Sequence, residues 1–220
     1  MNEPYLRILF QPEVESPILI SGLPGFGNIG KIVAHLLIEF FRARPFAELY
    51  SPSFPDIVLI DQNGICRPPR YELYISKHGR DIIILTGDAQ PSLEDIPAHY
   101  EVCGKILDMM EEMGCRFIIT IGGVPASHQV REIYVAATSP KIAIDYMEKG
   151  AIIYGNGKIM GASGLLLGLA KRRGMDGVCL LGSTTGIAAD RESAFHVFRF
   201  LIRILRDLGA APPESAFPIL

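Results

Sequence analysis

Four short segments of the chain are almost wholly apolar, and a glycine closely follows each of them. They are residues 17–20, 81–85, 116–121 and 177–181, followed by Gly22, Gly87, Gly122 and Gly182. Strands at the centre of a parallel sheet have this pattern, because helices cover both of their faces and leave no side to solvent. We therefore expect these segments to be the central strands of a mainly parallel sheet.

Three other segments mix apolar and polar residues and predict strands nearer the margins of that sheet. Residues 56–61, 71–77 and 132–138 are expected to be flanking or antiparallel strands. His78-Gly79-Arg80 has the composition of a tight turn. The segment 71–77 is therefore expected to form a hairpin with the strand at 81–85.

The sequence predicts four helices between or after the predicted strands. Apolar residues recur at helical spacing over residues 28–43, 102–113, 165–173 and 195–208. Ser163 and Asp190 stand where they can act as N-caps of the third and fourth of these helices. Strands alternating with helices predict an α/β fold, a three-layer α/β/α sandwich with a mixed, mainly parallel sheet.

The composition favours one folded unit. Of 220 residues, 49% are hydrophobic and 20% are charged, which allows a large core. No shift in composition divides the chain, so residues 1–209 are expected to form a single α/β domain. Residues 210–220 include Pro212 and Pro213, which block continuation of the last helix, and we expect them to be a flexible C-terminal tail.

Charge and apolar runs argue against two classes of partner. A net charge of −3 with a pI near 6.0 provides no electrostatic attraction to nucleic acid. No apolar run approaches the roughly 20 residues that a membrane-spanning helix needs. The chain is polar from Met1 onward and shows no signal peptide, so a cytoplasmic location is expected.

The four cysteines have no metal-site spacing, and no metal is expected. Cys103 and Cys179 lie within apolar segments, so both are expected to be buried, reduced thiols.

The sequence Gly25-Phe26-Gly27-Asn28-Ile29-Gly30 matches the dinucleotide-binding pattern G-x-G-x-x-G between a predicted strand and a predicted helix. Such a site also needs an acidic residue at the end of the next strand to hold the ribose. Glu48 is near the required distance but lies early in the segment 46–51, and Pro24 intrudes into the turn. We interpret the motif as a tight turn or a small anion site, and no cofactor is expected.

Further glycine-rich turns follow the other predicted strands, at residues 122–125, 161–164 and 182–186. Turns that leave the carboxyl ends of parallel strands gather at one edge of the sheet, where ligands normally bind. The candidate ligand-binding edge consists of Gly25, Gly27, Asn28, Gly30, Asp88, Gly122, Gly123, His128, Ser163, Gly164, Ser183 and Thr184.

No set of residues predicts catalysis. Gly161-Ala162-Ser163-Gly164 approaches a nucleophile elbow, but G-x-S-x-G requires a glycine where Leu165 stands. His128 with Asp88 is an alternative acid–base pair, although one histidine in a loop is a weak signal. We therefore assign no catalytic residue.

Several motifs recur in a specific order along the chain. They are Gly22-Leu23-Pro24-Gly25-Phe26-Gly27 with Gly30, Gly87-Asp88-Ala89-Gln90-Pro91-Ser92, Gly122-Gly123, Ala136-Ala137-Thr138, Gly161-Ala162-Ser163-Gly164-Leu165-Leu166-Leu167-Gly168-Leu169-Ala170-Lys171 and Cys179-Leu180-Leu181-Gly182. In this order, over residues 16–208, they resemble the archaeal branch of the proteasome assembly chaperone family. The resemblance implies a phosphorylase/hydrolase-like α/β/α fold, homo-oligomerisation and binding to proteasome α subunits, and no enzyme activity.

The C-terminal tail is a candidate docking segment. Relatives that dock on proteasome rings resemble ring activators, which end in a hydrophobic residue, a tyrosine and any residue. This chain ends Phe217-Pro218-Ile219-Leu220, with Ile219 in place of the tyrosine. An apolar tail with a terminal carboxylate can enter a pocket that carries a lysine. The alternative is a frayed end with no partner.

Two functions therefore remain open from the sequence. The first is a non-enzymatic assembly chaperone that binds proteasome α subunits as a homo-oligomer. The alternative is a protein that binds phosphate, a nucleotide or a nucleoside at the glycine-rich edge, or a hydrolase- or phosphorylase-like enzyme that uses this edge.

Overall fold

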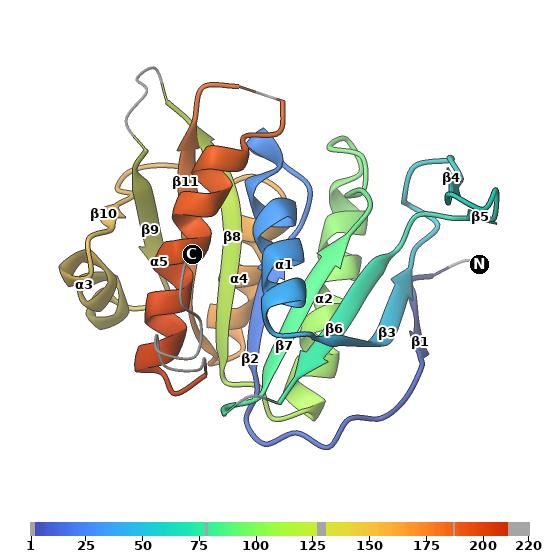
Figure 1. Ribbon diagram of the computed structural model, residues 1–220, viewed down its shortest axis with the longest axis horizontal. Coiled ribbons are helices and arrows are strands. Elements are labelled where there is room, and N and C mark those ends of the chain that lie inside the picture. Colours follow the sequence, from blue (N-terminus) through green and yellow to red (C-terminus); the bar gives the residue numbers. More distant parts are fainter. Residues whose placement is uncertain (1–2, 78, 127–130, 187, 211–220) are drawn as a thin grey trace.

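The protein folds around one twisted sheet with helices on both faces (Figure 1). A computed structural model describes residues 3–77, 79–126, 131–186 and 188–210. The strands within these ranges are β1 (Tyr5–Ile8), β2 (Ile18–Gly22), β3 (Arg44–Tyr50), β4 (Leu59–Ile60), β5 (Cys66–Arg67), β6 (Tyr71–Ser76), β7 (Ile82–Gly87), β8 (Phe117–Pro125), β9 (Ile133–Ala137), β10 (Ile152–Ile153) and β11 (Asp176–Thr184). The helices are the 3-10 turn η1 (Phe26–Asn28), α1 (Ile29–Phe40), α2 (Ile96–Glu112), α3 (Pro140–Glu148), α4 (Ala162–Arg172) and α5 (Arg191–Asp207).

The strand order of the described sheet is β1-β3-β6-β7-β2-β8-β11-β9-β10. The four apolar segments of the sequence form β7, β2, β8 and β11, which are adjacent and mutually parallel. β6 pairs antiparallel with β7, and β9 pairs antiparallel with β11. The predicted hairpin between residues 71–77 and 81–85 is therefore confirmed, and so is the mixed, mainly parallel sheet.

Alternate residues of the central strands face two separate cores. Ile18 and Ile20 pack with α1 and α5 on one face, while Leu19 packs with α2 and α4 on the other. Cys179 lies in the second core and is completely buried, as predicted. Both faces are thus apolar because each has its own pair of helices, which is the physical origin of the uninterrupted apolar runs. The three-layer prediction is confirmed.

Some local predictions were wrong or incomplete. Residues 56–61 do not join the main sheet: only Leu59–Ile60 is a strand, and it pairs with Cys66–Arg67 in a separate hairpin. The segment reads as a strand because it is rich in aliphatic residues, but Ile57, Val58 and Ile60 are all more than half exposed. β1, α3 and β10 were not predicted, because short marginal elements carry little periodicity.

Candidate functional site

The turn between β2 and α1 packs directly against the carboxyl end of the neighbouring strand β8. A Cβ atom on Gly123 would lie 2.2 Å from the carbonyl oxygen of Phe26, and one on Gly30 would lie 2.6 Å from that of Ile121. Gly27 has φ of 61°, a conformation that favours glycine. The glycines therefore allow the backbone of the β2–α1 turn to lie directly against the backbone of β8.

The carboxyl end of β11 closes the same edge from the other side. The hydroxyl of Thr184 donates a 2.8 Å hydrogen bond to Asp190, whose backbone amide donates one of the same length to the carbonyl of Gly27. Arg131 forms ion pairs of 2.9 Å with Asp190 and 2.8 Å with Glu192. The β11–α5 connection is thereby tied to the glycine turn.

Asp190 also caps α5, as predicted. Its side chain accepts a hydrogen bond of 3.0 Å from the backbone amide of Ser193. Burial alone would raise the pKa of Asp190, but hydrogen bonds from Ser193 and Thr184 and the charge of Arg131 lower it. The carboxylate is thus held charged by several donors at once. Its role as a cap was visible in the sequence, but its contact with Arg131, which is 59 residues away, was not.

Gln90 connects the glycine turn to the start of α4. Its side-chain amide donates to the carbonyl of Pro24 and accepts a 2.9 Å hydrogen bond from the backbone amide of Ala162. The first amide of α4, a typical place for a bound anion, is therefore occupied by a side chain of the protein itself. Gln90 belongs to the motif Gly87–Ser92, but no pattern in the sequence indicates this contact.

Ser163 does not cap α4, and this prediction was wrong. The N-cap is Gly161, and the hydroxyl of Ser163 instead donates a 3.0 Å hydrogen bond to the carbonyl of Ile121. The helix starts earlier than the apolar stripe suggested, because Gly161 has φ of 73° and turns the chain one residue before Ala162. Ser163 thus joins α4 to β8.

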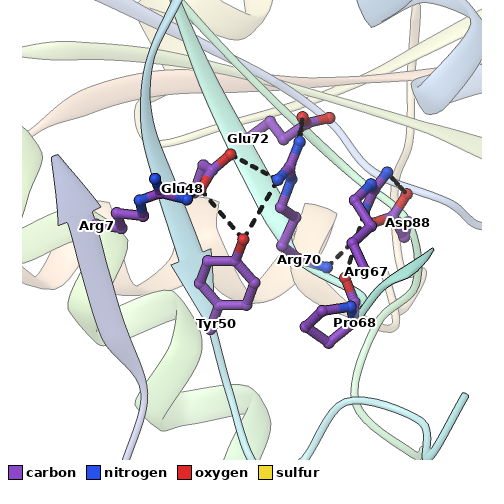
Figure 2. A network of polar contacts seen from close by, with 8 residues as sticks. All are labelled: Arg7, Glu48, Tyr50, Arg67, Pro68, Arg70, Glu72 and Asp88. Atoms are coloured by element: carbon purple, nitrogen blue, oxygen red, sulfur yellow. Dashed lines mark hydrogen bonds and ion pairs between the residues drawn. The ribbon is translucent and has the colours of Figure 1, made fainter. Parts of the chain in front are cut away.

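Asp88 directly follows β7, and the donors to its carboxylate come from Arg67 and Arg70, outside the glycine turn (Figure 2). Arg67 contacts both of its oxygens, at 2.5 and 3.0 Å, and the backbone amide of Arg70 donates to it at 3.0 Å. Burial alone would raise the pKa of Asp88, but these hydrogen bonds and the Arg67 charge lower it. Asp88 is therefore a charged anchor for the chain that enters β6.

Arg70 continues this network across the margin of the sheet (Figure 2). Its guanidinium lies 2.6 Å from Glu48 and 2.7 Å from Glu72, and it donates to the hydroxyl of Tyr50 at 3.3 Å. Arg7 reaches Glu48 from β1 at 3.3 Å. Glu48 lies on the antiparallel strand β3 and is bound by arginines, so it does not stand where a ribose-binding carboxylate would.

The structure thus divides the predicted edge into parts. Eight of the predicted edge residues lie together around the carboxyl ends of β2, β8 and β11. They are Gly27, Asn28, Gly30, Gly122, Gly123, Ser163, Ser183 and Thr184. Gly25 is exposed at the rim of the turn. Gly164 instead faces the segment before α4, where its Cβ would meet the carbonyl of Ile159 at 2.2 Å. His128 and the tail residues Phe217, Ile219 and Leu220 lie outside the described residues.

Two further features were considered in the sequence, a metal site and a membrane-spanning helix. In this part of the chain, no group of His, Cys, Asp and Glu side chains is arranged to hold a metal ion. None of the helices described above is both long and apolar enough to cross a membrane.

Fold and site together define a three-layer α/β/α protein whose sheet edge is closed by its own glycine turns and side chains. The chain belongs to the PAC2 family, whose model matches residues 19–211. The resemblance to proteasome assembly chaperones is thereby confirmed.

Solved structures and a sequence relative agree with this assignment. The chain is similar to Pyrococcus furiosus PbaB, described as an archaeal proteasome activator, with 36% identity, coverage of 98% of this chain and 93% of that one, and a TM-score of 0.88. It is also similar to P. furiosus PbaA, described as an archaeal homolog of proteasome-assembly chaperone, with 27% identity, coverage of 91% and 82%, and a TM-score of 0.78. An uncharacterised protein of Methanocaldococcus jannaschii is 32% identical over 82% of this chain and 70% of its own length.

Proposed function

We propose that this protein is a non-enzymatic, proteasome assembly chaperone-like protein that acts in the cytoplasm and binds proteasome α subunits as a homo-oligomer. The observation that carries the proposal is the similarity to PbaB over nearly the whole of both chains, at 36% identity. The similarity to PbaA, a homolog of an assembly chaperone, supports the same partner class.

The local contacts of the sheet edge support a binding role without chemistry. The glycine turns are filled by main chain, Gln90 occupies the start of α4, and the carboxylates of Asp88 and Asp190 are each held by an arginine. An acid–base mechanism needs a group that is able to exchange its proton near neutral pH. The pKa values of Asp88 and Asp190 are lowered, so both carboxylates stay charged near neutral pH and do not exchange a proton there.

The two relatives suggest two modes of engagement, which one experiment separates. We expect the full chain to co-elute with isolated proteasome α subunits in size-exclusion chromatography with light-scattering detection. An assembly chaperone binds free α subunits, whereas an activator binds the assembled ring and accelerates hydrolysis of a fluorogenic peptide. Failure to bind either form at micromolar concentrations would refute the proposed function.

The tail is tested in the same assay. Deletion of residues 211–220 leaves the buried Ala210 and all of the helices and strands described above in place. If Phe217, Ile219 and Leu220 dock on the partner, this deletion weakens the complex. If affinity is unchanged, the contact lies on the folded body.

A further inference from the structure

Arg42 occupies a position at the end of α1 that the other α-helices described above give to glycine. The residue that follows the cap of α2, α3, α4 and α5 is a glycine with φ between 68° and 104°: Gly114, Gly150, Gly174 and Gly209. The residue after each glycine donates its backbone amide to a carbonyl in the last turn of the helix. α1 ends with the same hydrogen bond, from Ala43 to Ile38 at 2.9 Å, but its left-handed residue is Arg42, with φ of 47°.

The backbone conformation of Arg42 is unfavourable for an arginine. In the left-handed region the Cβ atom of an L-residue crowds the following carbonyl oxygen, and glycine is the usual residue at this point of a helix because it avoids that contact. We therefore expect the fold to be more stable with glycine at residue 42. Backbone strain of this kind concentrates where a side chain serves binding or another function. The Arg42 side chain lines a pocket, and the other residues of the pocket indicate what it binds.

The pocket lies where the end of α1 meets residues 10–13 and the facing ends of β3 and β6, and its volume is about 480 Å³. Ile75, which is buried, and Phe10, which is half-buried, contribute to its apolar lining. Arg44 and Lys77 line it together with Arg42. The guanidinium of Arg44 lies over the Phe10 ring, 5.2 Å from the ring centre. The pocket thus combines three cationic side chains with apolar surface.

The chain does not neutralise the positive charge of this pocket. Within the described ranges, the three cationic side chains form no ion pair. Among the described lining residues the carboxylate is that of Glu13. Glu39, in the last turn of α1, and Asp81, which accepts a hydrogen bond from the amide of Glu15, are the other acidic residues close by in the chain. Three cations and one carboxylate therefore line the pocket, and an anionic ligand would reduce the repulsion among the cations.

The exposure of the cations indicates a ligand with several negative charges. Arg42, Arg44 and Lys77 are all exposed, and one ion pair at an exposed position contributes little. A small ion is therefore not retained, whereas a protein segment with several carboxylates and an apolar side chain engages the cations and the Phe10 ring together. A nucleic acid is also anionic, but Glu13 in the pocket and the net charge of −3 oppose the approach of a continuous polyanion.

We propose that this pocket binds an acidic segment of a partner protein. Carboxylates of the segment pair with Arg42, Arg44 and Lys77, and an apolar side chain of the segment packs against Phe10. The site lies at the opposite end of α1 from the glycine turn. It goes beyond the proposed function, because it does not depend on a proteasome subunit as the partner.

Arg42→Gly separates a binding role of this residue from a structural one. The probe is the fluorescein-labelled peptide Glu-Glu-Phe-Glu-Glu, and fluorescence anisotropy at low salt measures its dissociation constant for the full chain. We expect Arg42→Gly to raise this constant about ten-fold, which corresponds to the loss of one charge-assisted hydrogen bond. The same variant is expected to have a higher Tm, because glycine relieves the left-handed strain. A residue with a purely structural role would not combine higher stability with weaker binding.

A second variant removes the other two cations. Arg44→Gln/Lys77→Gln is expected to raise the dissociation constant of the peptide about ten-fold or more. Lys171→Gln/Arg172→Gln is the matched control, because it removes the same charge from exposed residues at the end of α4. Neither of these two side chains forms an ion pair in the part of the chain that the structure describes. The control should bind the peptide as wild type does.

Several results would overturn the proposal. One is the absence of peptide binding by wild type at millimolar concentration, and another is equal binding of Gln-Gln-Phe-Gln-Gln, since charge would then not be recognised. Tighter binding of inorganic phosphate or a single-stranded oligonucleotide, lost in the same variants, would assign the pocket to phosphate groups and refute the acidic segment. Unchanged peptide binding by Arg42→Gly would remove Arg42 from the site, and the proposal would be wrong. No proteasome subunit is present in these assays, so their outcome is independent of the proposed function.

Discussion

At the scale of single residues, the charged side chains near the sheet edge act as fixed anchors. Asp88 has one arginine on both of its oxygens and a backbone amide on one of them. Glu48 is 6% exposed and is contacted by Arg7, Arg70 and the hydroxyl of Tyr50. Removing one partner of such a buried group leaves the other without compensation, which costs more than the pair contributes.

Asp88 provides a prediction with a defined pH dependence. Its pKa is lower in the folded protein than the ordinary value of 3.8. A carboxyl group of this kind stabilises the fold above its unfolded-state pKa, and the contribution disappears as the pH falls through the folded-state pKa. We expect Asp88→Asn to lower the free energy of unfolding at pH 7 by on the order of 1–3 kcal/mol. The difference from wild type should shrink below about pH 4.

Urea denaturation between pH 7 and pH 3 measures this difference. Asp56→Asn is the matched control, since Asp56 is exposed and has no ion pair in the described part of the chain. A difference from wild type that is as large at pH 3 as at pH 7 would contradict the assigned role.

At the scale of elements, the glycines decide how closely a turn can approach a strand. The β2–α1 turn contacts β8 through Gly123 and Gly30 and contacts β11 through Gly27. Gln90 and Ser163 then join α4 to the same turn and to β8. A dinucleotide-binding turn uses its glycines to let a pyrophosphate approach, whereas here neighbouring chain segments take that space.

Gly123→Ala tests the role of these close contacts. The added methyl group would lie 2.2 Å from the Phe26 carbonyl oxygen, which belongs to the backbone and has little freedom to move. We expect a loss of at least about 2 kcal/mol in the free energy of unfolding. In Gly104→Ala, the control in the middle of α2, the nearest atom is 4.0 Å away. That variant should be more stable by up to about 1 kcal/mol.

Chemical denaturation of both variants gives the comparison. Equal stabilities for Gly123→Ala and wild type would show that the turn has room to shift. The conclusion that these glycines are needed for close contact between the β2–α1 turn and β8 would then be wrong.

At the scale of the whole molecule, the contacts define faces with different roles. The carboxyl edge of the sheet is filled by the chain's own groups, and the α2–α4 face exposes an apolar groove. The β4–β5 hairpin projects from the opposite margin of the sheet from α3 (Figure 1). The chain thus combines a closed carboxyl edge with an exposed apolar groove.

The alternative function is binding of a small molecule at the glycine-rich edge of the sheet. Thermal unfolding with and without ligands tests it. A ligand at 100 times its dissociation constant adds about 2.7 kcal/mol to stability. We expect no change in Tm with inorganic phosphate, ATP or NAD, because Gln90 occupies the first amide of α4 and the glycine turn packs against β8 and β11. A saturable rise of several degrees with any of them would favour the small-molecule alternative.

The sequence by itself determined the layers of this fold. Uninterrupted apolar runs place β7, β2, β8 and β11 at the centre, and the helical stripes place helices between them, because burial on two faces leaves a pattern in the residues of each segment. The cap at Asp190 was also predictable, since capping acts over only a few residues.

Only the tertiary structure decided what the sheet edge does. Ser163 joins β8 instead of capping α4, Asp88 is bound by Arg67, and Gln90 bridges two turns 66 and 72 residues away from it. The exposure of Leu93, Ile96 and Met160 around the α2–α4 groove was equally invisible, because an apolar residue reads the same in a sequence whether it faces the core or solvent. Such contacts depend on which distant segments the fold brings together, and the local pattern of residues does not encode that pairing.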